Sequence, residues 1–262
     1  MIIVAAILAV IAVVLLFTAR SHGKKALDIG SVETSTAKDL ISLAEDVAKE
    51  IGAGSFSQQV ELKGVAESGQ SLKSEMTAEP CVWYRSVVTR EYEENYTERD
   101  SDGKTTTRTR RGSEIVSSNE RSIAFALRDA SGSITVDPDG ASIDSVKVLS
   151  RFENGELGTG FSIGSFRFSV GVPGRGRRTL GYKMEEFILP LGKDLYVLGE
   201  ARDESGKLKV GKPSKKGARF IISTKSEEEL LKAAKGGQKG LNIAAIALGI
   251  GAIAMAVFSF FK

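Results

Sequence analysis

Two short stretches of this sequence concentrate arginine, the residue type best suited to bind an acidic partner. A guanidinium group presents several N–H donors in a planar fork that fits a carboxylate or a phosphate. The second stretch, at 171–181, also contains Gly-x-Gly, but a P-loop needs Gly-Lys-Ser/Thr opening a helix, and that pattern is missing. This stretch is therefore expected to be an exposed loop. We therefore predict a surface that contacts lipid headgroups or an acidic protein, with these candidates: Arg108, Arg110, Arg111, Arg175, Arg177 and Arg178.

Acid–base and metal chemistry find less support in the residue types. Glu185 and Glu186 are adjacent, and neighbouring strand residues point to opposite faces, so they do not form a catalytic pair. Asp137, Asp139 and Asp144 lack the EF-hand spacing and its terminal glutamate, which favours ordinary turn chemistry.

The chain contains one cysteine, Cys81, and one histidine, His22. This composition excludes an intrachain disulfide and most zinc sites, and it makes a Cys–His dyad improbable. Beside Val82 and Trp83, Cys81 is expected to be a small buried thiol. We predict no catalytic residue, no metal site and no cofactor, and no nucleic-acid partner.

Both ends of the chain carry long apolar runs, over 2–19 and 241–261. About 20 helical residues span a hydrocarbon core of ~30 Å, so each run predicts a membrane helix. The alternative for the first run is a cleaved signal peptide, but it has no basic n-region and no small-x-small cleavage pattern. The predicted organisation is a first anchor at 1–19, a linker with an amphipathic helix at 20–53, a β-rich domain at 54–235 and a second anchor at 241–261.

Small residues recur in the second anchor at near-helical spacing, as Ala245, Gly249 and Ala252 or as Ala247 and Gly251. Such faces let membrane helices approach closely. The first anchor is the obvious partner for this face. Another copy of the chain is the alternative, which would give a homo-oligomer.

Basic residues flank both anchors on the side of the middle domain: Arg20, Lys24, Lys25, Lys225, Lys232, Lys235 and Lys239. Basic residues close to the membrane favour the cytoplasmic side. This bias predicts an integral membrane protein with its middle domain in the cytoplasm and both termini outside.

Between the anchors, the sequence alternates as strands do. An amphipathic helix is predicted at 35–54, with Ser35 or Thr36 as N-cap, and a second soluble helix at 226–235, with a Ser226–Glu229 capping box and a stop at Gly236-Gly237. From 60 to 223 the pattern is strand after strand, so we predict a mainly β (α+β) fold. Burying it requires a closed sandwich or barrel-like domain with short flanking helices, between two transmembrane helices.

The long strand from Cys81 to Glu98 is expected to bury Val82 and Tyr84 and to expose Arg90. Asp102-Gly103 reads as a hairpin tip. The returning strand is polar at its start, so this ribbon is predicted to project from the body and to carry the first group of arginines.

Several of these segments resemble the GIDE domain, also called the beside-a-membrane (BAM) domain. They are Pro80-Cys81-x-x-Tyr84, "FALRDASGSITVDPDGA", "MEEFILPLGKDLYVLGEA" and "ARFIISTKSEEELL". The resemblance covers 60–261 and includes the order anchor, domain, anchor. In MULAN-type mitochondrial ubiquitin ligases, this domain lies between two membrane helices and a zinc-binding RING follows. One cysteine and one histidine cannot hold two zinc ions, so a RING-less member is expected. RING-less chains of this kind resemble bacterial and archaeal members, which implies a protein of a prokaryotic cell membrane.

The resemblance implies a domain that senses or binds partners at the membrane. Our first hypothesis is a non-enzymatic binding protein for a protein or lipid partner, in envelope stress or membrane organisation. The second is a substrate-selecting component of an E3-ligase-like system with a separate catalytic partner. The third is a homo-oligomeric membrane scaffold or pore.

Overall fold

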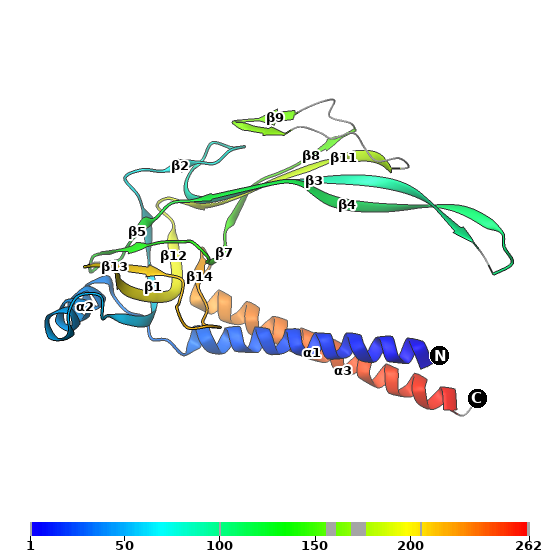
Figure 1. Cartoon of the computed structure of the whole chain (residues 1–262), viewed down its shortest axis with the longest axis horizontal. Helices are drawn as coiled ribbons and strands as arrows, with labels where there is room; N and C mark the ends of the chain where they lie inside the picture. Colours follow the sequence, from blue (N-terminus) through cyan, green and yellow to red (C-terminus); the bar gives the residue numbers. More distant parts are fainter. Residues whose placement is uncertain (1, 100, 156–160, 169–176, 205, 261–262) are drawn as a thin grey trace.

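The computed structural model describes residues 2–99, 101–155, 161–168, 177–204 and 206–260. Two long helices lie side by side along one side of the molecule, the β-sheets lie along the other, and the short helix lies at the end far from both termini (Figure 1). The predicted mainly β fold between two apolar helices is therefore confirmed.

Five strands close into a barrel. They are β1 (Ser57–Glu67), β5 (Phe125–Arg128), β6 (Ser133–Val136), β13 (Lys207–Gly211) and β12 (Asp194–Glu204), and the ring closes because β12 pairs back onto β1. Two short strands, β14 (Ile221–Ser223) and β7 (Ser142–Asp144), continue the sheet beside β12. The barrel form of the predicted fold is thus the one the chain adopts.

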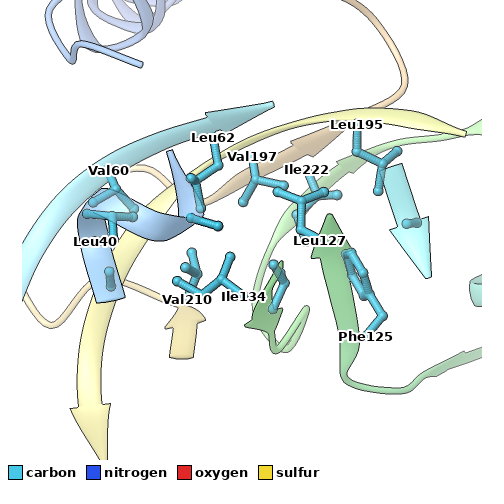
Figure 2. Packing of buried hydrophobic residues seen from close by; sticks show 14 of the residues in the cluster. Leu40, Val60, Leu62, Phe125, Leu127, Ile134, Leu195, Val197, Val210 and Ile222 are labelled. Atoms are coloured by element: carbon cyan, nitrogen blue, oxygen red, sulfur yellow. The ribbon is translucent and has the colours of Figure 1, made fainter. Parts of the chain in front are cut away.

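The barrel interior holds the main apolar core, which Figure 2 shows with Val60, Leu62, Leu127, Val197 and Ile222 pointing toward one another. Alternation along β1 places the side chains of Val60 and Leu62 inside the barrel, as strand geometry requires. Helix α2 (Ala37–Ile51) closes one side of this core through Leu40 and its neighbours.

Both predicted caps are present. Thr36 is the N-cap of α2 and Gly52 its C-cap. Asp129, in the turn between β5 and β6, also accepts a hydrogen bond from the first backbone N–H of α2, at Ala37, at 2.7 Å. Ser226 and Glu229 form the expected capping box at the start of α3 (Glu227–Phe260).

A second sheet carries the projecting ribbon. Its strands run in the order β4 (Thr105–Ser122), β3 (Pro80–Arg99), β11 (Arg177–Pro190) and β8 (Val146–Asn154), with β2 (Leu72–Lys73) beside the start of β3. A small hairpin of β9 (Phe161–Ile163) and β10 (Phe166–Phe168) packs on it, where the Phe168 and Tyr182 rings meet edge to face at 6.1 Å.

The two long helices are longer than the sequence pattern predicted. α1 runs unbroken over Ile2–Gly30, past the expected end at residue 19, and α3 continues through Gly236-Gly237. The expected stop there is wrong. A Cβ at Gly237 would lie 2.9 Å from His22 Nδ1, so the missing side chain makes room for α1, and packing between the helices offsets the low helix propensity of glycine.

α1 and α3 form an antiparallel pair with both chain ends at the same end (Figure 1). Buried alanines recur every seven residues along α1, at Ala5, Ala12, Ala19 and Ala26. Small residues at such an interface let two helices approach closely. Most apolar side chains of the pair remain exposed, including Ile3 and Ile253, which suits lipid better than a soluble core. By length and composition, both helices can cross a membrane.

Candidate partner-binding site

The ribbon is built by β3 and β4, which pair continuously from Trp83 and Ser122 out to Arg99 and Thr105. Among the described residues, β11 accompanies β3 as far as Glu94, and beyond that point only β3 and β4 form the described part of the ribbon. It extends away from the barrel toward the end of the molecule that holds both termini (Figure 1). The prediction that this segment projects is confirmed.

Four of the six candidate arginines meet at the root of this ribbon. β3 lies between β4 and β11, and its register places Glu94 opposite Arg110 on one side and Arg177 on the other. Glu93, one residue earlier, lies between Arg111 and Arg178 in the same way. We call these residues the arginine–glutamate cluster: Glu93, Glu94, Arg110, Arg111, Arg177 and Arg178.

The remaining two candidates lie apart from the cluster. Arg108 is further along the ribbon, where it forms an ion pair with Glu98 at 3.0 Å. Arg175 lies outside the described residues. Arg177 and Arg178 were expected in a loop, but they open β11, because pairing with the long β3 strand extends the sheet to them.

On one face of β3, Glu94 is fully used by two arginines. Arg110 Nη2 lies 2.8 Å from Glu94 Oε2, and Arg177 Nε lies 3.2 Å from Oε1. Hydrogen bonds from Arg110, and then from Arg177, hold the pKa of Glu94 below its usual value. Arg177 also stacks over the Tyr92 ring, 4.7 Å from its centroid. This face therefore holds the three strands together.

On the other face, Glu93 is a looser partner. Arg111 Nε and Arg178 Nη2 lie 3.7 and 3.8 Å from Glu93 Oε2, which is beyond hydrogen-bond distance. Their side chains are 78% and 75% exposed. Two guanidinium groups therefore share one carboxylate, and within the described residues most of their donors have no partner.

Arg90 was expected to face water, but it is buried beside this cluster. Its Nη2 lies 2.8 Å from Glu114 Oε1, and its guanidinium lies 5.5 Å from the Tyr92 ring centroid. An arginine can be buried when a carboxylate and an aromatic face replace water. Sequence alternation alone does not reveal such partners on neighbouring strands.

The outer edge of β4 adds a second binding feature. Over its 18 residues, β4 pairs with β3 and with no other strand in the described part of the chain. A long unpaired edge offers backbone donors and acceptors to an added strand. Arg110 and Arg111 lie on this edge strand, so the same surface offers both backbone pairing and positive charge.

The ribbon and the helix pair extend in the same general direction (Figure 1). A charged, two-stranded ribbon with open edges cannot enter a hydrocarbon core. With α1 and α3 in a membrane, the ribbon must therefore lie against the headgroups or bend away from the helices. β-bulges permit such a bend, and the pairing of β3 with β4 shifts register between Val88 and Thr89.

The expected opposition of Glu185 and Glu186 is confirmed. Glu185 faces Lys147, at 2.5 Å, while Glu186 is fully buried. Glu186 accepts hydrogen bonds from the backbone N–H groups of Met76 and Thr77 and from the hydroxyls of Thr77 and Ser86, at 2.6–2.9 Å. Burial alone would raise the pKa of Glu186, but these donors outweigh it and lower the pKa. Its role is to hold the turn before β3.

Cys81 is buried as expected, and burial raises its pKa to about 11, so the thiol is not an activated nucleophile. Asp139 donates its backbone N–H to Asp137, which is ordinary turn bonding. Asp144 instead pairs with Lys225 at 2.8 Å.

In the helix pair, Ala245 and Ala252 are buried. Gly249 is half-buried, and a Cβ added there would meet no atom within 4 Å. Ala247 is exposed. The small residues of α3 are thus divided between a face that packs and a face that remains open.

Sequence reasoning missed the junction between the barrel and the helix pair. Glu61, on the outer face of β1, is 1% exposed and accepts hydrogen bonds from Tyr196 at 2.9 Å and from Thr34 at 2.5 Å. Lys63 lies 3.2 Å from Glu61 and 2.8 Å from Glu227, the first residue of α3. Burial, and then the charge of Glu61, raises the pKa of Tyr196.

Apolar contacts complete this junction. Ile29 from α1 and Leu230 from α3 pack on Tyr196, Leu198 and Ile221 of the barrel's outer face. Burying one such aliphatic side chain contributes about 2 kcal/mol. A cavity of about 760 Å³ lies beside the junction, lined by residues that include Lys63, Asp194, Lys225 and Glu227. The unbroken apolar run Leu195-Tyr196-Val197-Leu198, where a strand with one wet face would alternate, is a sequence signal that β12 is covered on both faces.

A protein-family model with the description "GIDE: E3 Ubiquitin ligase" matches residues 93–258. The match begins within β3, at the arginine–glutamate cluster, and ends within α3, and it covers more than half of the chain. No curated protein and no solved structure matches the chain.

Proposed function

Because the chain belongs to the GIDE (E3 ubiquitin ligase) family, we propose that it binds a protein partner at a membrane through the arginine–glutamate cluster. The partner supplies an extended, acidic segment. Its backbone adds to the edge of β4, and its carboxylates bind Arg111 and Arg178.

The observation that carries this proposal is the exposure of Arg111 and Arg178 on either side of one carboxylate. An arginine that already has a close carboxylate partner gains little from a second acid, whereas these two have donors that no described residue binds. Arg110 and Arg177 serve to hold the ribbon in place on the opposite face.

The junction supports a positioning role for the anchors. The Glu61 network joins the barrel to the segment after α1 and to the start of α3. Because polar and apolar contacts both cross this junction, the barrel cannot rotate freely about the helices. A membrane anchor of this kind presents the ribbon in one orientation relative to the bilayer.

The test is cross-linking and affinity recovery of the full chain from native membranes, with R111E/R178E compared with wild type. We expect the variant to lose its acidic cross-linked partner. The matched control is K38E/K73E, which makes the same charge change at two exposed lysines outside the arginine–glutamate cluster, on α2 and on β2 beside the start of β3. Equal recovery by R111E/R178E would remove the cluster from the binding site.

The family description favours a second candidate, in which this binding selects substrates for a separate ubiquitin-like transfer protein. In that case, the partners recovered with wild type would carry a ubiquitin-like modifier, and R111E/R178E would reduce their modification in cells. A homo-oligomeric scaffold would instead appear as a multiple of the chain's mass in detergent.

A further inference from the structure

A second group of positive charges gathers where the helix pair meets the barrel. It combines α1, α3 and the loop between β13 and β14, which are far apart in the sequence. We call these residues the basic collar: Arg20, Lys24, Lys25, Lys215, Lys216, Lys232, Lys235 and Lys239.

The loop between β13 and β14 is held against α1 by specific contacts. Arg219 Nε lies 2.8 Å from Asp28 Oδ2, and Arg219 Nη2 donates to the backbone carbonyl of Ser21 at 3.0 Å. A Cβ at Gly217 would lie 3.9 Å from Lys24 Nζ. Lys215 and Lys216 are therefore brought beside Lys24 by the fold, and Figure 1 shows this loop descending onto the helix pair.

The basic collar is not neutralised within the chain. None of its eight members forms an ion pair with any residue in the described ranges, and all except the half-buried Lys25 are exposed. The one nearby carboxylate that contacts the loop, Asp28, is occupied by Arg219. The surface therefore keeps its full positive charge.

The depth of the collar matches lipid headgroups. At 1.5 Å per residue, Lys24 lies about 7.5 Å beyond Ala19, the last residue of the apolar run. The polar layer on each side of a ~30 Å hydrocarbon core is about 5–8 Å thick. Arg20 and Lys239 lie at the edge of the apolar runs, and Lys24 lies at the outer part of the headgroup layer.

We propose that the basic collar binds the phosphate groups of anionic lipids, and that Lys215 and Lys216 close over headgroups held by Arg20 and Lys24. Lysines suit this task because each ammonium is a compact charge on a flexible stem. The attraction acts within a Debye length, about 8 Å at physiological salt, and the collar lies within that distance of the headgroups. This inference is independent of the ribbon's partner.

The test uses the full chain reconstituted in vesicles of phosphatidylcholine with phosphatidylglycerol. Spin-labelled forms of each lipid report the fraction in contact with protein. We expect wild type to prefer the anionic lipid by about threefold, and K215E/K216E to reduce that preference toward one. K38E/K73E, with the same charge change, keeps the wild-type preference.

Either of two results would overturn the proposal. An unchanged preference in K215E/K216E would mean that the loop takes no part. Stronger displacement of the lipid by inorganic phosphate than by chloride at equal ionic strength would mean a site for free anions. The expected result is equal weakening by both salts, because screening depends on ionic strength.

Discussion

The ribbon and the basic collar are both rich in positive residues, yet they differ in what surrounds the charge. At the ribbon root, four arginines share Glu93 and Glu94 across three strands. In the collar, eight cations have no carboxylate partner in the described ranges. The first arrangement gives a shaped surface, partly neutralised by its own carboxylates, for a specific partner, and the second gives an unpaired positive charge that attracts anionic lipid headgroups.

The largest expected effect is on membrane orientation, because in each molecule the middle domain lies wholly on one side of the membrane or on the other. Since the ribbon's charges largely cancel, the collar should decide which side the domain occupies. In sealed inside-out vesicles we expect trypsin to digest the middle domain of wild type. K24E/K235E/K239E should give a mixed orientation, while R111E/R178E should behave as wild type. Protection of wild type would place the domain outside and contradict a cytoplasmic location.

The next effect is on the junction that sets the collar's position. Glu61→Ala leaves the Tyr196 hydroxyl and Lys63 without their buried acceptor, which should cost about 3 kcal/mol. The midpoint of thermal unfolding in detergent should fall by about 10 °C. Glu61→Gln keeps the shape and an acceptor oxygen and should lose less. If the two variants unfold at the same temperature as wild type, the network does not stabilise the junction.

Lowering the pH should weaken the ribbon root and the turn before β3 and leave the basic collar unchanged. Glu186 and Glu94 have folded pKa values below the ordinary value of 4.5, so their stabilisation is present above that value and is lost as pH falls through the lowered one. Protection from hydrogen exchange, relative to the intrinsic rate at each pH, should therefore fall around Met76 and the ribbon root below pH 4.5, while the lysines of the collar keep their charge. Loss of lipid preference in step with the ribbon would show that the regions are coupled.

The smallest effect distinguishes the two faces of the cluster. Arg110→Ala removes a close partner of Glu94 and should increase trypsin cleavage in the ribbon by a few-fold, because local opening becomes easier. Arg111→Ala removes a loose and exposed contact, and its stability effect should lie within about 0.5 kcal/mol. Equal protease sensitivity of the two variants would mean that the faces do not differ.

Local patterns predicted many of the elements correctly. The capping residues Thr36 and Ser226, the opposition of Glu185 and Glu186 and the buried Cys81 all follow from one- to four-residue relationships. The helix stop at Gly236-Gly237 was wrong for a complementary reason. The low helix propensity of glycine is a local cost that the sequence shows. The close packing of Gly237 against His22 on α1 offsets that cost, and it depends on tertiary structure that a sequence pattern does not show.

The sequence by itself determined that two apolar helices flank a β-rich domain in the chain and that arginines and lysines gather in particular segments. Only the tertiary structure decided which charges are free. The register of β3 with β4 and β11 brings four arginines to two glutamates, and Arg219 holds the β13–β14 loop against α1 beside Lys24. Electrostatic interactions depend on distance in space, and residues from 16 positions apart (Glu94 and Arg110) to 191 positions apart (Asp28 and Arg219) become neighbours only when the chain folds.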